Sequence, residues 1–252
     1  MHAPWLYCPD LHCGPATLDE TEGRHALASL RLRPGDAVTL FDGCGHVAPA
    51  TLLAGETGAA RAAHRRARPS TVRVDAIETV SPPAHALTLI VPGCKGDRLD
   101  WLVEKCTELG VTRLLFTEFE RSVVHVPNTR VEKLRRAAIE ACKQCRRAWL
   151  PSIRILTTLT DAQAAVGAAR VLVAHPAEDA APLGPWLTDH LSLVPELAVV
   201  IGPEGGLSDS EVDLLRSASG QLVRLAEHIL RVETAAVAVA AAWASAAITL
   251  RG

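Results

Sequence analysis

Residues 201–206, Ile-Gly-Pro-Glu-Gly-Gly, place a carboxylate and three glycines directly after an apolar run that is typical of a buried strand. Ser208 and Glu211 have capping-box spacing, which predicts that a helix begins just after the glycines. A glycine loop before a helix N-terminus can bind anions through its free N–H groups. The loop lacks the Lys-Ser/Thr of a P-loop and the spacing of a dinucleotide fingerprint, and Glu204 would repel phosphate. The segment is therefore either a tight turn or a site for a ligand without phosphate.

A second pair of candidate residues, Arg231 and Glu233, lies just before a long apolar segment. Glu233 and Thr234 are expected where the following helix has its N-cap, and Arg231 is expected to project from the preceding loop. A surface salt bridge and a helix cap would explain this pair without any chemistry. Residues 173–179 form a third loop after an apolar run. Loops at the carboxyl ends of strands form the ligand sites of open α/β sheets, so the three loops together indicate one binding site.

The composition is that of a globular protein, with 48% hydrophobic and 21% charged residues in a chain of 252. The net charge of -2 gives no overall attraction to nucleic acids or membranes, although local basic patches can still bind RNA. Seven irregularly spaced cysteines indicate reduced thiols in a cytoplasmic protein. Cys142 and Cys145 form a CxxC that Cys8, His12 and Cys13 could complete, but cysteines packed in a helix are the better interpretation, and no metal is expected.

The start of the chain shows no signal peptide. The apolar run at 234–250 is shorter than the roughly 20 residues that span a membrane, and it predicts a buried or interface helix.

Two domains are expected. Residues 1–73 are β-rich, with predicted strands at 38–41 and 46–53 joined by a turn at Asp42-Gly43. Four arginines between 61 and 68 occur without an acidic residue, which marks a domain edge. From 74 to 252, predicted strands alternate with predicted helices, a pattern typical of an α/β domain with a parallel sheet.

Several segments together carry a resemblance to a known family. They are IGPEGGLSDSE, ILRVETAA, RHALASLRLRPGDAVTLFDGCGH, KGDRLDWLVEKCTELGV, ERSVV and RRAAIEACKQC. In this order and spacing the chain resembles the 16S ribosomal RNA uracil-N3 methyltransferases of the SPOUT class. The resemblance implies a PUA-like RNA-binding β-barrel over 1–73 and an α/β SPOUT domain with a C-terminal trefoil knot over 74–252. It also implies a homodimer.

The resemblance implies that S-adenosylmethionine binds in the knot, among residues 175–178, 201–206 and 225–230. The cofactor-binding residues that it implies are His175, Pro176, Ile201, Gly202, Pro203, Gly205, Gly206, Leu225, His228, Ile229, Leu230 and Thr234. Glycine permits close approach of the backbone to such a ligand. The chain departs from the usual family pattern at Ala226, Glu227 and His228, where a glycine and a basic residue are common.

For the reaction itself, Arg231 is expected to stabilise negative charge that develops on the uracil, because its guanidinium stays charged. Glu204 is expected to act either as a base or as a cofactor contact. Glu233 is expected to cap the helix or to orient Arg231.

The expected substrate is 16S rRNA of the small ribosomal subunit. The residues expected to bind it are Arg24, Arg31, Arg33, Arg65, Arg66 and Arg121. Two alternatives stay open: a SPOUT enzyme that methylates another RNA atom, such as a ribose 2′-oxygen, and a non-catalytic RNA-binding protein of ribosome assembly.

Overall fold

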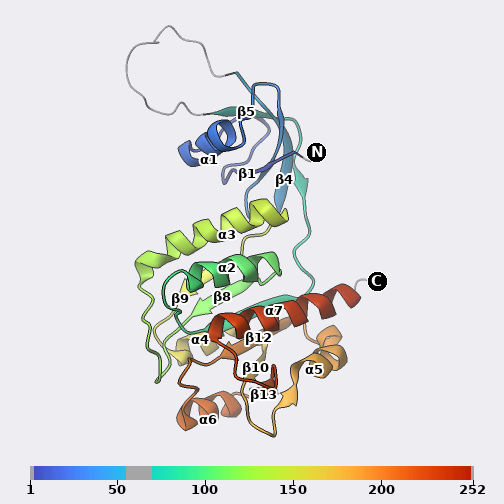
Figure 1. Ribbon diagram of the computed structural model, residues 1–252. Coiled ribbons are helices and arrows are strands. Elements are labelled where there is room, and N and C mark those ends of the chain that lie inside the picture. The colour runs from blue at the N-terminus through green and yellow to red at the C-terminus, as the bar shows by residue number, and fades with distance from the viewer. Residues whose placement is uncertain (1–2, 55–69, 251–252) are drawn as a thin grey trace. The chain divides into compact units, whose positions relative to one another are not determined.

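The computed structural model describes residues 3–54 and 70–250 and divides into two compact units (Figure 1). The first unit comprises Met1–Pro82 and Cys142–Leu150, and the second comprises Pro83–Ala141 and Pro151–Gly252. The expected boundary between residues 73 and 74 falls inside the first unit, on strand β5 (Thr71–Val74).

The first unit is built on a six-stranded sheet. Its strand order is β1 (Trp5–Tyr7), β3 (Ala37–Phe41), β4 (His46–Leu52), β5 and β2 (Gly14–Thr17), and β6 (Glu78–Thr79) also pairs with β4. The pair β1–β3 is parallel and the others are antiparallel. At the β3–β4 turn, Oδ1 of Asp42 accepts hydrogen bonds from the backbone N–H groups of Cys44 (2.7 Å) and His46 (3.0 Å). The predicted hairpin is therefore confirmed.

A buried ion pair within the first unit was not predicted. Nζ of Lys143, near the end of α3 (Val131–Cys145), lies 2.9 Å from Oε1 of Glu22 in α1 (Glu20–Arg24). Only 6% and 4% of the two side chains are exposed. The other carboxylate oxygen of Glu22 accepts a hydrogen bond from the backbone N–H of Tyr7. The ammonium group of Lys143 thus neutralises the Glu22 carboxylate, which would otherwise be a buried charge without a counter-ion.

The second unit is an α/β domain. Its seven-stranded sheet is parallel throughout. The strands, in sheet order, are β11 (Ala181–Pro182), β13 (Gln221–Arg224), β10 (Arg170–Ala174), β12 (Glu196–Ile201), β7 (Ala86–Val91), β8 (Arg113–Phe116) and β9 (Ser152–Ile155). The central strands β7 and β12 are buried over nearly their whole length, as expected for a sheet that helices cover on both faces.

The helices of this unit are α2 (Arg98–Glu108), α4 (Leu159–Val166), α5 (Leu183–His190), α6 (Asp209–Ser217) and α7 (Val232–Thr249), together with most of α3. Helix α7 lies beside α2 and also packs against α5, β7 and β12 (Figure 1). By length and composition α7 would be able to cross a membrane, but its contacts make it a core helix. These contacts bury one face of α7, which agrees with the predicted buried or interface helix.

The strand order brings three loops together. Strand β10 lies between β12 and β13, so the chain leaving β12 crosses β10 before it forms β13. After β13 the chain returns, as α7, to β7 and β12. Because the three strands are adjacent and parallel, the loops after their carboxyl ends meet at one edge of the sheet.

Candidate functional site

A cavity of about 410 Å³ lies where these three loops meet. The lining residues are Arg121, Ala174, His175, Pro176, Ile201, Gly202, Pro203, Glu204, Gly205, Gly206, Leu207, Arg224, Leu225, Ala226, His228, Ile229, Leu230, Val232 and Ala235. All of the cofactor-binding residues implied by the sequence line it, except Thr234. The lining combines exposed peptide backbone with apolar side chains and a few charged groups, which suits an organic ligand of moderate size.

The glycine loop contributes Gly202, Gly205 and Gly206 to the wall of the cavity. Gly206 has a φ of +75°, and nothing lies within 4 Å of the position that a Cβ would take. Its N–H donates to the carbonyl of Pro203 at 2.8 Å, which closes the turn. At Gly202 a Cβ would lie 2.9 Å from Cγ of Leu207, so the chain folds closely on itself there. Glycine is therefore required both by the turn and by the packing.

The predicted capping box is confirmed at the start of α6. The backbone N–H of Ser208 donates to Oε2 of Glu211 (2.8 Å), and the N–H of Glu211 donates to Oγ of Ser208 (3.3 Å). The second oxygen of Glu211 accepts a hydrogen bond from the N–H of Glu120 at 2.8 Å. Glu211 thus joins the helix behind the glycine loop to the loop that follows β8.

Arg121 strengthens this connection. Its Nη1 donates to the carbonyl oxygens of Gly205 (3.2 Å) and Leu207 (3.3 Å). Arg121 was predicted as an RNA contact, and the structure places it in the wall of the cavity.

The loop after β13 carries the departure from the family pattern. Ala226 and His228 line the cavity, whereas Glu227 is exposed and does not. Ile229, in the same wall, is 90% exposed. On the neighbouring loop after β10, Nδ1 of His175 accepts a hydrogen bond from the N–H of Ala177 at 3.2 Å, which orients the imidazole.

Arg231 and Glu233 are arranged differently from the prediction. Arg231 is itself the N-cap of α7, so the expectation that Glu233 and Thr234 lie at the cap is wrong. The side chain of Arg231 is exposed, and within the described ranges it has neither an ion pair nor a hydrogen bond. Glu233 is buried and pairs instead with Arg98 of α2, whose Nη1 lies 3.5 Å from Oε1. Glu233 therefore neither caps the helix nor orients Arg231.

Two carboxylates affect a buried thiol beside this helix start. Burial, and then the negative charges of Glu233 and Glu204, raise the pKa of Cys94 to about 12. Cys94 is thus a neutral thiol at physiological pH.

Over residues 3–54 and 70–250, no group of three or more His, Cys, Asp or Glu side chains is arranged to hold a metal ion.

The other predicted RNA contacts lie apart from the cavity residues in the sequence and belong to the first unit. Arg24, Arg31 and Arg33 are exposed, and Arg24 pairs with Glu20 at 2.7 Å. Arg65 and Arg66 lie outside the described residues.

Part of the cavity wall was not predicted from the sequence. Arg224 supplies a second cation, and Ala174, Leu207, Val232 and Ala235 supply apolar surface. Arg224 is the last residue of β13. Because ligand sites of α/β sheets lie at the carboxyl ends of strands, its position in the sequence could have indicated that it lines the site. The small apolar residues carry no such signal.

Comparisons with known proteins agree with this geometry. Residues 81–244 match the family described as RNA methyltransferase domain, and residues 18–60 match the RNA methyltransferase PUA domain. The ribosomal RNA small subunit methyltransferase E of Mycobacterium bovis is 32% identical over 232 residues, which cover 88% of this chain and 82% of the relative. The protein of the same name from Synechocystis is 28% identical, over 87% of this chain and 69% of the relative.

Solved structures show the same fold along nearly the whole chain. A ribosomal RNA small subunit methyltransferase E from Neisseria gonorrhoeae, bound to S-adenosyl methionine, is 29% identical with a TM-score of 0.80 and 96% coverage of each chain. A probable rRNA-methyltransferase from Porphyromonas gingivalis is 29% identical with a TM-score of 0.77, over 94% of this chain and 95% of that one. The predicted fold class, a SPOUT α/β domain with an N-terminal PUA-like domain, is confirmed. The chain therefore belongs to the RNA methyltransferase family of the ribosomal RNA small subunit methyltransferase E proteins.

Proposed function

We propose that this protein transfers a methyl group from S-adenosylmethionine to N3 of a uridine in 16S rRNA of the small ribosomal subunit. The observation that carries the proposal is the cavity at the ends of β10, β12 and β13, whose wall contains nearly all of the implied cofactor-binding residues. Relatives named ribosomal RNA small subunit methyltransferase E support the substrate class.

The residues present fit the cofactor. The open space beside the backbone of Gly206 allows a flat ring to approach the peptide units directly. Ile201, Leu225 and Leu230 supply the apolar wall that an adenine ring requires. His175, Pro176 and His228 complete the proposed holding set from the two neighbouring loops. When bound, the cofactor supplies an electrophilic methyl group.

The protein's own contribution to the reaction is electrostatic. Neutral uracil is a poor nucleophile at N3, so the N3 proton must leave and the resulting charge on O2 and O4 must be stabilised. Arg231 is the proposed cation for these oxygens, because its side chain is exposed beside cavity residues Leu230 and Val232 and has no partner among the described residues.

Glu204 is the proposed carboxylate of the site, since it is exposed in the same wall. If it accepts the N3 proton, Glu204→Gln lowers kcat and leaves the cofactor Kd unchanged. If it contacts the cofactor, the same variant raises the Kd.

The proposed path of the RNA uses exposed cations. Arg24, Arg31 and Arg33 on the first unit are exposed, and Arg121 lies in the cavity wall. Each phosphate contact releases counterions, so RNA affinity is expected to fall steeply with salt.

We also propose that the protein is a cytoplasmic homodimer. All seven cysteines are free, as in a reducing compartment. Ala241, Ser245 and Ile248 are exposed one helical turn apart on α7, and Ile248 is 71% exposed. A stripe of small residues that ends in an exposed isoleucine suits close packing against a second copy.

Calorimetry with S-adenosylmethionine tests the proposal directly. We expect saturable binding that is lost when the glycine loop is altered. An absence of binding at millimolar cofactor would favour the non-catalytic RNA-binding alternative, for which the Ala226-Glu227-His228 departure is the relevant feature.

A further inference from the structure

Arg224 is a cation in the wall of the cofactor cavity to which the proposed reaction assigns no role. Its side chain is exposed, and over the described parts of the chain it has neither an ion pair nor a hydrogen bond. Arg121, the other arginine of this wall, already donates to the carbonyl oxygens of Gly205 and Leu207. Arg224 therefore has all of its guanidinium N–H groups available for a ligand in the cavity.

Strand pairing places Arg224 in the same row as two other lining residues. The last paired row across β12, β10 and β13 consists of Ile201, Ala174 and Val223. The next residues along the chain, Gly202, His175 and Arg224, all line the cavity. The N–H of His175 donates to the carbonyl of Val223 at 2.9 Å, so β10 and β13 are still joined at this row. Because Arg224 also pairs with Pro182 of β11, its backbone is fixed within the sheet.

The charges of S-adenosylmethionine indicate which of its groups meets this arginine. The cofactor carries a positive sulfonium, a positive ammonium and one negative carboxylate. A fixed cation beside the sulfonium or the ammonium would weaken binding, because like charges repel. Opposite a carboxylate, the same guanidinium can donate two parallel hydrogen bonds to an oppositely charged group. An unpaired arginine in the wall of this site therefore favours the carboxylate as its partner.

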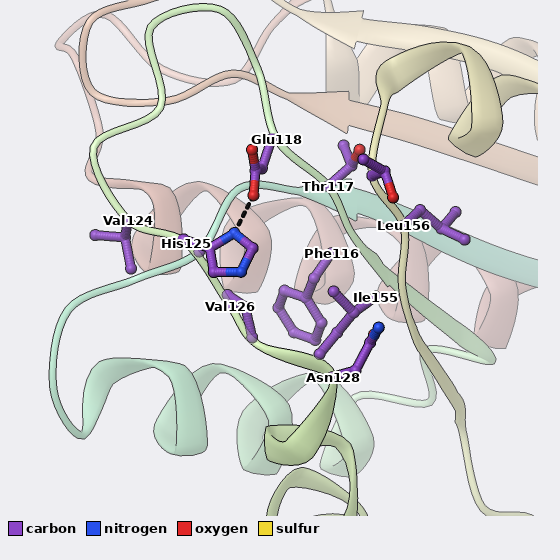
Figure 2. Close-up of a pocket in the computed structure, with 11 residues that line it drawn as sticks. Phe116, Thr117, Glu118, Val124, His125, Val126, Asn128, Ile155 and Leu156 are labelled. Atoms are coloured by element: carbon purple, nitrogen blue, oxygen red, sulfur yellow. Dashed lines mark hydrogen bonds and ion pairs between the residues drawn. The ribbon is translucent and has the colours of Figure 1, made fainter.

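The second cavity at this edge of the sheet offers no comparable site for a carboxylate. It lies at the carboxyl ends of β7, β8 and β9 and has a volume of about 90 Å³ (Figure 2). Among the described residues that line it, the titratable side chains are Glu118 and His125, which contact each other through Oε1 and Nδ1. An anion there would meet the charge of Glu118 and an imidazole that is already engaged. The negative end of the cofactor is thus expected in the larger cavity.

We propose that Arg224 binds the carboxylate of S-adenosylmethionine and so orients the methionine end of the cofactor. Arg224 and Arg231, which both lack a partner among the described residues, then have different ligands, because Arg231 is assigned to the uracil. Loss of Arg224 is expected to change the cofactor Kd, whereas loss of Arg231 is expected to change the rate of methyl transfer. This inference rests on the proposed methyltransferase function.

Calorimetry with S-adenosylmethionine and with decarboxylated S-adenosylmethionine tests the proposal, because the second ligand keeps the adenosine, the sulfonium and the ammonium and lacks only the carboxylate. We expect the wild-type protein to bind the decarboxylated ligand about tenfold more weakly. Arg224→Gln should weaken the binding of S-adenosylmethionine by about the same factor. It should leave the affinity for the decarboxylated ligand unchanged or higher, since Arg224 repels a wholly cationic ligand. The preference for the carboxylate should therefore disappear.

Two further variants and a stability measurement serve as controls. Arg224→Lys keeps the charge and loses the paired donors, so we expect it to retain part of the preference. Arg154→Gln removes another exposed arginine without a described partner, on β9, that does not line the cofactor cavity, and its preference should equal that of the wild type. Arg224→Gln should melt at the wild-type temperature, because the side chain has no partner to lose among the described residues.

The proposal is overturned if the wild-type protein binds both ligands equally, or if Arg224→Gln keeps the preference. It is also overturned if Arg224→Gln leaves the affinity for S-adenosylmethionine unchanged and reduces the salt dependence of RNA binding, because the arginine would then contact an RNA phosphate. A wild-type protein that binds neither ligand would refute the proposed cofactor site itself, and the role of Arg224 with it.

Discussion

The guanidinium of Arg121 donates from Nη1 to the carbonyl oxygen of Gly205 across 3.2 Å. The two residues are 84 positions apart in sequence. A Cβ at Gly205 would lie 3.1 Å from Cβ of Arg121, so the two chain segments are already in close contact. This contact fastens the loop after β8 to the glycine loop, and a change in either segment is expected to affect the cofactor cavity.

Gly206→Ala is expected to weaken cofactor binding by about tenfold or more. The residue has a φ of +75°, a region that costs an alanine about 1–2 kcal/mol, and the added methyl group would project into the cavity. Gly184→Ala on α5 is the matched control, because its Cβ meets open space and its φ is not positive. Calorimetry with S-adenosylmethionine should show a loss for the first variant only. Equal affinities would contradict the assignment of the glycine loop.

Arg231→Ala is expected to lower the methyl-transfer rate by about a hundredfold and to leave the cofactor Kd near that of the wild type. The reason is that a cation which stabilises charge only in the transition state contributes to kcat rather than to binding. Arg136→Ala, which removes an exposed arginine on α3, is the control. Single-turnover rates on 16S rRNA measure the effect. A normal rate for Arg231→Ala would remove this residue from the mechanism.

Lys143→Met is expected to destabilise the first unit by about 3–5 kcal/mol, because it leaves the buried carboxylate of Glu22 without its partner. Adding Glu22→Gln should recover most of this loss, since the amide oxygen can still accept from the N–H of Tyr7. Arg24→Ala, which breaks the exposed pair with Glu20, should cost less than about 1 kcal/mol. Urea unfolding of the four proteins provides the comparison. A single-variant loss as small as that of Arg24→Ala would show that the buried pair contributes little.

Three buried cysteines are expected to resist alkylation at pH 9. Burial raises the pKa of Cys94, Cys106 and Cys142 to about 12 in each case, so they remain neutral thiols when exposed Cys13 and Cys44 react. A thiol whose pKa is raised in the folded protein stays protonated to a higher pH than the same thiol in the unfolded chain. Their contribution to stability is thus complete below about pH 9 and is lost as the pH rises toward 12. Iodoacetamide labelling read by mass spectrometry, and unfolding measured across this range, check both statements. Rapid labelling of Cys94 in the folded protein would contradict them.

Local patterns in the sequence predicted the elements that carry strong periodicity or turn chemistry. The β3–β4 hairpin and the Ser208–Glu211 capping box follow from such local rules, and both are present. The prediction that three loops form one site rested on the predicted parallel sheet and on the family resemblance. Contacts between distant segments had no local signal: the Glu22–Lys143 pair and the Arg98–Glu233 pair depend on side chains that only the fold brings together. The start of α7 was misplaced because Glu233 matches a helix-start pattern while its carboxylate is used by Arg98.

Mass spectrometry of 16S rRNA tests the central claim most directly. Unmodified 16S rRNA, or small subunits from a strain lacking the enzyme, would be incubated with the purified protein and methyl-deuterated S-adenosylmethionine, and the nucleosides would then be analysed. We predict labelled 3-methyluridine at one position, formed about a hundredfold more slowly by Arg231→Ala and at the normal rate by Arg136→Ala. Label in a 2′-O-methylated nucleoside, or no label in the RNA at all, would contradict the proposed reaction.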